Sequence, residues 1–380
     1  MRYQNWIWIF AAAVWSCTPN KKPPIAEPKV HWQANAHAQL FEIGTLQQDT
    51  FLKLYTLNNL NQRECIHRVF WGMSEATTYP SFEKINSRKR WVVLTTIFAA
   101  FLKELEFTNP AFKTDSILVG CDQNRFLSRS LFPQKEKITS VQPTGQIQLE
   151  KLLSLKPDLV LAYFIAAKDK QQLERAKKAG ISVLFCQSHL EPNPLGRAEW
   201  QRVFQALAGQ PNNSFSDEIT RYKTIQTQYK TYPWVNTMVN LPYSGTWDIP
   251  CANSYLAQLL YDARCKAVWL ENGAYQGSGS AQIGLEQGMT FLTQAEVWIN
   301  PGLCDSKACI SQTDVRLQQA LAFKQGRIIQ HDAQIEPDGA NVFWDMGAVH
   351  PSLVLEDLGL LAHEYGTDLH KRAHFYRILP

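Results

Sequence analysis

The sequence lacks the patterns that mark several large functional classes. No closely spaced pair of cysteines is followed by a histidine pair, so no zinc motif of the usual spacing is present. The formal net charge is only +4 over 380 residues, and the basic residues form no long run. A protein that binds nucleic acid normally gathers positive charge on one face, so we expect no nucleic-acid partner.

Signs of catalysis and of direct metal binding are also missing. Ser278 lies between Gly277 and Gly279, but no strand leads directly into it, and these glycines match neither a nucleophile turn nor a dinucleotide fingerprint. His370 and His374 are one helical turn apart but lack the third ligand that a tight site needs. We therefore expect no enzyme, no bound cofactor and no metal held by side chains alone.

The amino-terminal residues predict export and lipid attachment. The apolar run at residues 6–15 is too short to span a bilayer but suits the core of an export signal. It stops at Ser16 and Cys17, which resembles the processing site of bacterial lipoproteins and predicts a lipidated Cys17 at the end of a signal, residues 1–17. An ordinary signal peptide or an anchor helix with an incidental cysteine is the alternative. The proline-rich residues 18–38 are expected to form a tether in the periplasm or cell envelope.

Two halves of the remaining chain repeat one order of predicted elements. Each half reads strand, helix, a short motif ending in Leu-Glu, and a second strand. In the first half these are residues 91–96, 99–105, 146–150 and 158–163, and in the second 235–241, 254–261, 282–286 and 296–300. Strands that alternate with helices and carry continuous apolar runs are typical of buried parallel sheets. The sequence thus predicts an α/β protein with two parallel-sheet lobes.

The linker between these lobes is predicted to be one helix, at residues 214–231. The first lobe then covers residues 39–213, including a β-hairpin at 40–45 and 51–57, and the second covers residues 232–380. A single helix as the only connection would be stiff and allow little hinge motion. Ligands of such sheets bind beyond the carboxyl ends of the strands, so we expect a cleft where the two lobes face each other.

The eight cysteines predict some disulfide bonding in an oxidising compartment. Cys304 and Cys309 lie close together in a loop-like stretch and are the best local pair. Cys121 and Cys186 each end a predicted strand, so a bond across neighbouring strands is a second hypothesis.

Five ordered motifs resemble the periplasmic binding proteins of the iron-siderophore, haem and cobalamin transporters, in their lipoprotein version. They are residues 91–100, 148–163, 247–263, 285–300 and 341–358. The resemblance implies a monomeric substrate-binding component of an ABC importer, which captures a metal chelate for a membrane permease. Ferric siderophore is the first expectation, with cobalamin or haem as alternatives. Two departures are Arg264 and Cys265, where the family tends to have glycines, and a longer stretch at residues 197–210.

The ends of the predicted strands supply the candidate ligand-binding residues. We expect Trp247 and Trp344 first, because exposed aromatic side chains suit large chelates. The other candidates are Thr96, Tyr163, Thr95, Tyr243 and Asn300. Arg125 could bind an anionic ligand, but a solvated surface arginine is the simpler interpretation.

Glu150 and Glu286 occupy equivalent places in the two repeats, each at the start of a predicted helix. The resemblance implies that such glutamates dock onto the permease, one from each lobe. First-turn stabilisation, worth about 0.3–1 kcal/mol, is the alternative. For the whole protein, the alternatives are an enzyme or cofactor scaffold on the same two-lobe plan that acts on a metal chelate, and a structural surface lipoprotein.

Overall fold

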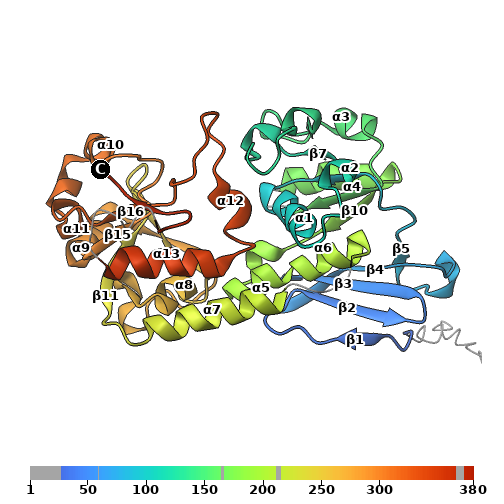
Figure 1. The fold of residues 1–380 in the computed structure, drawn as a ribbon, viewed down its shortest axis with the longest axis horizontal. Helices are drawn as coiled ribbons and strands as arrows, with labels where there is room; N and C mark the ends of the chain where they lie inside the picture. Colours follow the sequence, from blue (N-terminus) through green and yellow to red (C-terminus); the bar gives the residue numbers. More distant parts are fainter. Residues whose placement is uncertain (1–26, 59, 164–166, 211–214, 365–371) are drawn as a thin grey trace, which may run out of the picture.

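The computed structural model describes residues 27–58, 60–163, 167–210, 215–364 and 372–380. Two lobes lie side by side, with the amino-terminal half on the right and the carboxyl-terminal half on the left of Figure 1. Cys17, the signal segment and His370 lie outside the described residues. No helix in the described part of the chain combines the length and apolar character needed to cross a membrane.

The first lobe is built on a five-stranded parallel sheet. Its strands are β6 (Trp91–Val93), β7 (Leu118–Cys121), β8 (Thr139–Ser140), β9 (Leu159–Ala162) and β10 (Ser182–Phe185), in the order β10-β9-β6-β7-β8. Every residue of β6 and β9 is buried, as expected for strands covered on both faces. Helices α1 (Thr96–Thr108), α2 (Thr114–Ile117), α3 (Leu149–Ser154) and α4 (Ala167–Lys178) belong to this lobe.

The second lobe repeats this arrangement. Strands β11 (Val235–Val239), β13 (Cys265–Ala267), β15 (Val297–Ile299) and β16 (Ile328–Gln330) are parallel, and β17 (Arg377–Ile378) adds an antiparallel edge, in the order β13-β11-β15-β16-β17. Read from the other side, β16-β15-β11-β13 matches β10-β9-β6-β7. The predicted repeat and fold class are therefore confirmed.

The helices of the second lobe occupy most of the predicted positions. They are α8 (Tyr255–Asp262), α9 (Leu285–Gln294), α10 (Lys307–Thr313), α11 (Leu321–Lys324), α12 (Val342–Met346) and α13 (Pro351–His363). One prediction was wrong in detail, because residues 282–284 do not open a helix. They end strand β14 (Ser280–Gly284), which pairs with β12 (Thr246–Pro250) in a separate antiparallel ribbon.

The predicted hairpin is the centre of a third sheet. Strands β2 (Phe41–Leu46) and β3 (Asp49–Leu57) are antiparallel, and β1 (His31–Gln33), β4 (Arg63–Trp71) and β5 (Glu83–Lys84) complete the order β1-β2-β3-β4-β5. Two buried carboxylates attach it to the first lobe. Glu199 accepts hydrogen bonds from the amides of residues 36–38, and Glu191 accepts from those of residues 39 and 40.

Helix α7 (Phe215–Tyr229) lies within the range predicted for the linker and runs along α13 (Figure 1). It follows α5 (Pro194–Glu199) and α6 (Gln201–Ala208) of the first half. The close approach to α13 requires a glycine at position 359, because a Cβ atom there would lie 2.2 Å from the Tyr229 ring. The linker is thus packed against the second half along its length.

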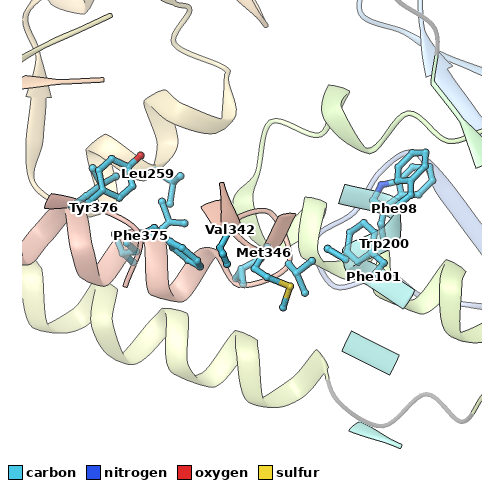
Figure 2. Close-up of a cluster of buried hydrophobic side chains, with 14 of the residues drawn as sticks. Phe98, Phe101, Trp200, Leu259, Val342, Met346, Phe375 and Tyr376 are labelled. Atoms are coloured by element: carbon cyan, nitrogen blue, oxygen red, sulfur yellow. The ribbon is translucent and has the colours of Figure 1, made fainter. Parts of the chain in front are cut away.

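Apolar side chains also join the two lobes. Figure 2 shows this core from Trp200, Phe98 and Phe101 of the first lobe, past Met346 and Val342 of α12, to Phe375 and Tyr376 of the second. These residues belong to a single buried cluster. The lobes are therefore held together by packing as well as by the linker.

Three carboxylates of the second lobe make polar contacts with the first lobe. We call Glu336, Asp338 and Asp345 the acidic clasp. Glu336 accepts hydrogen bonds from the amide of Arg129 (2.5 Å) and from the amide of Ser130 (2.9 Å). Asp345 accepts from the amide (3.0 Å) and hydroxyl of Ser128, and Asp338 pairs with Lys135 at 2.8 Å. The expectation that the helix alone fixes the lobe arrangement is therefore incomplete.

The cysteine predictions had different outcomes. The Cys304–Cys309 disulfide is present, which confirms that pair. Cys121 and Cys186 are free and buried, so the second pairing was wrong. The reason is topological: Cys121 ends β7, and strands β6 and β9 separate β7 from β10.

The turn after Asp262 forms without glycine. Arg264 takes the left-handed conformation that glycine usually supplies, with φ of 58°. Its guanidinium donates to the Lys230 carbonyl at 2.6 Å and lies 4.5 Å from the centre of the Trp234 ring. These contacts explain how a long side chain is accommodated at this position.

Candidate functional site

Three neighbouring strands of the second lobe are each followed by a polar residue at the same edge of the sheet. Asn240 follows β11, Asn300 follows β15, and His331 follows β16. Both asparagines adopt left-handed backbone conformations, with φ of 61° and 55°, so the chain turns sharply as it leaves each strand. Carboxyl ends of adjacent parallel strands share one edge, which brings these side chains together.

A cavity of about 430 Å³ lies at this edge. Its size falls within the range of small-molecule sites, roughly 300–1,000 Å³. Most of the lining comes from the second lobe and is aromatic or aliphatic. The lining residues are Arg197, Asn240, Tyr255, Leu256, Leu259, Asn300, Gly302, Leu303, His331, Phe343, Trp344, Val354 and Tyr376.

The aromatic wall of this cavity is formed mainly by α12. Trp344 is 55% exposed although it is large and apolar, and its ring packs edge-on against Phe343. The His331 ring lies 4.5 Å from the ring of Phe343 and 4.8 Å from that of Trp344, measured between centroids. A flat apolar ligand could cover the exposed face of Trp344 and remove it from water.

The polar residues beside this aromatic wall, His331 and Asn300, are neutral. Burial lowers the pKa of His331 to about 4, so its imidazole is uncharged at neutral pH. Its Nδ1 atom and the Oδ1 atom of Asn300 are buried, and neither has a hydrogen-bond partner among the residues that the structure describes. Buried polar atoms are normally paired, so a ligand could supply the missing partners.

One loop of the cavity mouth is covalently fixed. Leu303 is fully exposed, and the disulfide between Cys304 and Cys309 closes the segment that follows it. The Gln330 amide donates to the carbonyls of Gly302 and Cys304, at 2.9 and 3.0 Å. The loop at the mouth is thus fixed by the disulfide and by the hydrogen bonds of Gln330 at the end of β16.

The first lobe contributes Arg197 of α5 to the cavity. Its guanidinium lies 4.1 Å from the centre of the Tyr255 ring, so it is stacked on an aromatic side chain. It donates to the backbone carbonyls of His189 (2.6 Å) and Glu191 (3.0 Å). Arg197 is therefore a positive group held in place at the boundary between the lobes.

The facing edge of the first lobe carries its own buried polar groups. Tyr163 follows β9, and its ring lies 5.0 Å from that of His189. Burial lowers the pKa of His189 to about 4 and raises that of Asp122 to about 6. These residues do not line the cavity, but they lie at the carboxyl ends of the equivalent strands.

The predicted ligand residues are only partly brought together. Trp344 and Asn300 both line the cavity. The Thr96 hydroxyl donates to the Trp344 carbonyl at 3.4 Å, so it lies beside the site, whereas Thr95 is buried at the start of α1. Tyr243 is 83% exposed in a turn and does not line the cavity.

Trp247 is where the sequence interpretation was wrong. Its side chain is fully buried, donates to the Val239 carbonyl at 2.8 Å and packs near Trp298. Gly288 leaves room for it, since a Cβ atom there would lie 2.4 Å from the indole. Trp247 is a core residue of the second lobe and cannot contact a ligand in this conformation.

Arg197 and His331 were missed by the sequence analysis. His331 directly follows β16 (Ile328–Gln330), a run of three residues that is too short to be predicted as a strand from the sequence. In the structure this run pairs with β15. Nothing in the sequence near Arg197 indicates that it reaches the other lobe.

Glu150 and Glu286 are each the second residue of their helices, α3 and α9, which confirms their equivalence. Both are exposed. Glu286 pairs with Arg316 at 2.9 Å, and Arg316 also pairs with Asp314. The carboxylate in the second lobe is therefore partly neutralised.

A larger cavity, of about 560 Å³, lies elsewhere on the second lobe. Trp234, Tyr261 and Leu270 are among its lining residues, next to the edge strand β13. It lies along β13 and is lined by none of the residues that follow β11, β15 and β16, whose carboxyl ends form the edge where ligands of such sheets bind, so we favour the smaller cavity as the site. No group of three or more histidine, cysteine or acidic side chains among the described residues could hold a metal ion.

Comparisons with known proteins agree with this fold. No protein-family model matches the chain. An uncharacterised lipoprotein of Methanocaldococcus jannaschii is 24% identical over 248 residues. The match covers 63% of this chain and 56% of that relative, so the chain spans little more than half of the relative's length.

Solved structures with similar folds include periplasmic binding proteins. CeuE of Helicobacter pylori, solved with nickel and histidine, has a TM-score of 0.54 at 14% identity, over 82% of this chain and 88% of that one. A periplasmic heme-binding protein of Pseudomonas aeruginosa has a TM-score of 0.52 at 15% identity, over 74% and 96%. A periplasmic binding protein of Veillonella parvula has a TM-score of 0.55 at 12% identity, over 83% and 99%. The chain therefore shares the fold of these binding proteins.

Proposed function

We propose that the protein is the substrate-binding component of an ABC importer, which captures a metal chelate and delivers it to a membrane permease. A ferric siderophore is the first candidate ligand, and haem or cobalamin are the alternatives. The observation that carries the proposal is the cavity at the carboxyl ends of β11, β15 and β16, walled by aromatic side chains and facing a second, similar lobe. Neutral polar groups and a lack of clustered metal ligands among the described residues favour a metal that arrives already chelated.

Ligand identification is the decisive experiment. The protein purified from its native envelope should carry a coloured chelate, which visible absorbance and mass spectrometry would identify. Titration of the stripped protein with haemin, cobalamin and ferric siderophores should quench tryptophan fluorescence, since Trp344 lies on the cavity wall. Chemical conversion of the chelate during incubation would instead support an enzyme, and failure of every chelate to bind would overturn the proposal.

The two equivalent glutamates are the proposed contacts with the permease. Glu150→Lys and Glu286→Lys should each abolish uptake while leaving chelate affinity unchanged, because both side chains are exposed and away from the cavity. Glu64→Lys, an exposed change on β4, is the matched control for charge reversal. Loss of chelate binding in the first two variants would contradict a docking role.

Attachment to the membrane through Cys17 is the remaining part of the proposal. The M. jannaschii relative is named a lipoprotein, which supports it. Labelling with a fatty-acid analogue should modify the wild-type protein, and Cys17→Ser should lose both the label and the membrane association. A labelled Cys17→Ser variant would contradict this assignment.

A further inference from the structure

We propose that Arg197 makes the cavity selective for chelates that carry an anionic group, such as a carboxylate or a catecholate, over neutral chelates of the same shape. This inference rests on the proposed binding function and specifies its ligand class. It assigns Arg197 as the residue that contacts the anionic group.

The first observation is that Arg197 brings a positive charge into a largely apolar cavity. Nine of the other lining residues are aromatic, aliphatic or glycine residues, and the other polar members are two asparagines and His331. Burial lowers the pKa of His331 to about 4, so this imidazole does not share the positive charge at neutral pH. Arg197 is therefore the one cation among the residues that line the cavity.

The second observation is that no carboxylate in the described part of the chain forms an ion pair with this guanidinium. Arg197 donates through Nε to the Glu191 carbonyl and through Nη2 to the His189 carbonyl, and Nη1 has no such bond among the described residues. The nearby Glu191 carboxylate is already engaged by the amides of Gln39 and Leu40 and by the Trp200 indole. Burying an unpaired charge is costly, so an anion entering the cavity would recover that cost.

The third observation is that the guanidinium is fixed before any ligand arrives. Two backbone carbonyls hold one side of its plane, and the Tyr255 ring lies beneath it at 4.1 Å. The Tyr255 hydroxyl in turn donates to the Gly347 carbonyl at 3.2 Å, which ties the stack to the segment after α12. A donor held in this way loses little conformational freedom when it binds an anion.

The geometry also predicts how a ligand would lie. The anionic group would sit at Nη1 of Arg197, at the boundary of the lobes. The flat remainder would extend over the exposed face of Trp344 toward Leu303 at the mouth.

The test compares two pairs of chelates that differ in charge but little in shape. Haemin is paired with its dimethyl ester in the same detergent, and ferric tris(catecholate) with neutral ferric tris(benzohydroxamate), which also carries one aromatic ring on each ligand. In each pair the anionic member should bind wild-type protein at least about tenfold more tightly, as expected for a hydrogen bond to a charged group. Arg197→Gln should reduce this ratio to near one, and Arg197→Lys should keep part of it. Arg221→Gln, which removes an exposed arginine on α7, is the matched control and should leave the ratio unchanged.

The outcomes separate this inference from the proposed function. If neither pair binds, the binding function itself is wrong for these chelates. If both members of a pair bind equally to the wild type, the function stands and the selectivity assigned to Arg197 is refuted. Thermal unfolding of Arg197→Gln shows whether it folds, and the wild-type ratio decides the question even if that variant does not.

Discussion

His350 joins three elements, and its environment leads to a quantitative expectation about pH. It lies just before α13, its Nε2 atom is 3.1 Å from the Glu104 carboxylate of α1, and its Nδ1 atom is 3.6 Å from the Glu218 carboxylate of α7. Glu218 also accepts hydrogen bonds from the amide and hydroxyl of Ser352, at 2.7 and 2.9 Å. This cluster connects the first lobe, the linker and the second lobe.

Burial alone would lower the pKa of His350, but hydrogen bonds to Glu104 and Glu218 outweigh burial and raise it from 6.5 to about 9. A histidine whose pKa is raised in the folded state stabilises the fold fully below pH 6.5 and loses that effect as the pH rises through 9. Each pH unit between the two values is worth about 1.4 kcal/mol, so the protonated cluster contributes about 3 kcal/mol.

The perturbation is His350→Gln, and the assay is urea unfolding of both proteins between pH 6 and pH 10. We expect the variant to be about 3 kcal/mol less stable than the wild type at pH 6, with the difference shrinking between pH 6.5 and pH 9. His31→Gln is the control, because that side chain is exposed on β1 and its replacement should change stability by less than about 1 kcal/mol. A difference that stays constant with pH, or grows as the pH rises, would refute this reasoning.

Three further changes test other parts of the structure. Trp247→Ala should cost about 3–5 kcal/mol in urea unfolding because it empties a buried site, and a change below 1 kcal/mol would contradict its place in the core. Trp344→Leu should instead leave stability nearly unchanged but weaken chelate binding, and an unchanged chelate affinity in this variant would place the ligand elsewhere. Burial raises the pKa of Asp345 to about 6, so the protein loses stability as the pH rises through 6 and this side chain ionises. Asp345→Asn should reduce the stability lost between pH 4 and pH 8 by about 3 kcal/mol. An unchanged loss in urea unfolding would argue against a buried charge at this position.

The fold could be predicted because its signals are local and repeated. Short apolar strands, each followed by a helix, appear in the same order in both halves, and the two parallel sheets repeat one strand arrangement. Cys304 and Cys309 could be paired because they are close in sequence. Cys121 and Cys186 could not be judged in this way, since the order of strands in space decides whether they meet.

The site was harder to predict because it depends on which way side chains point and on contacts between the halves. Residues Thr246–Pro250 alternate polar and apolar, and this pattern places Trp247 on the buried face of β12, so the error could have been avoided. Arg197 and the acidic clasp had no such signal. Their partners lie in other parts of the chain, and only the packed structure brings them together.

The disulfide beside Leu303 has a practical consequence for anyone producing this protein. Reduced material would keep both sheets but lose the covalent closure of the segment that shapes the entrance, so chelate affinities measured on protein made in a reducing cytoplasm would describe a different entrance. Secretion or oxidative refolding is therefore needed to obtain the disulfide-bonded form that the structure describes.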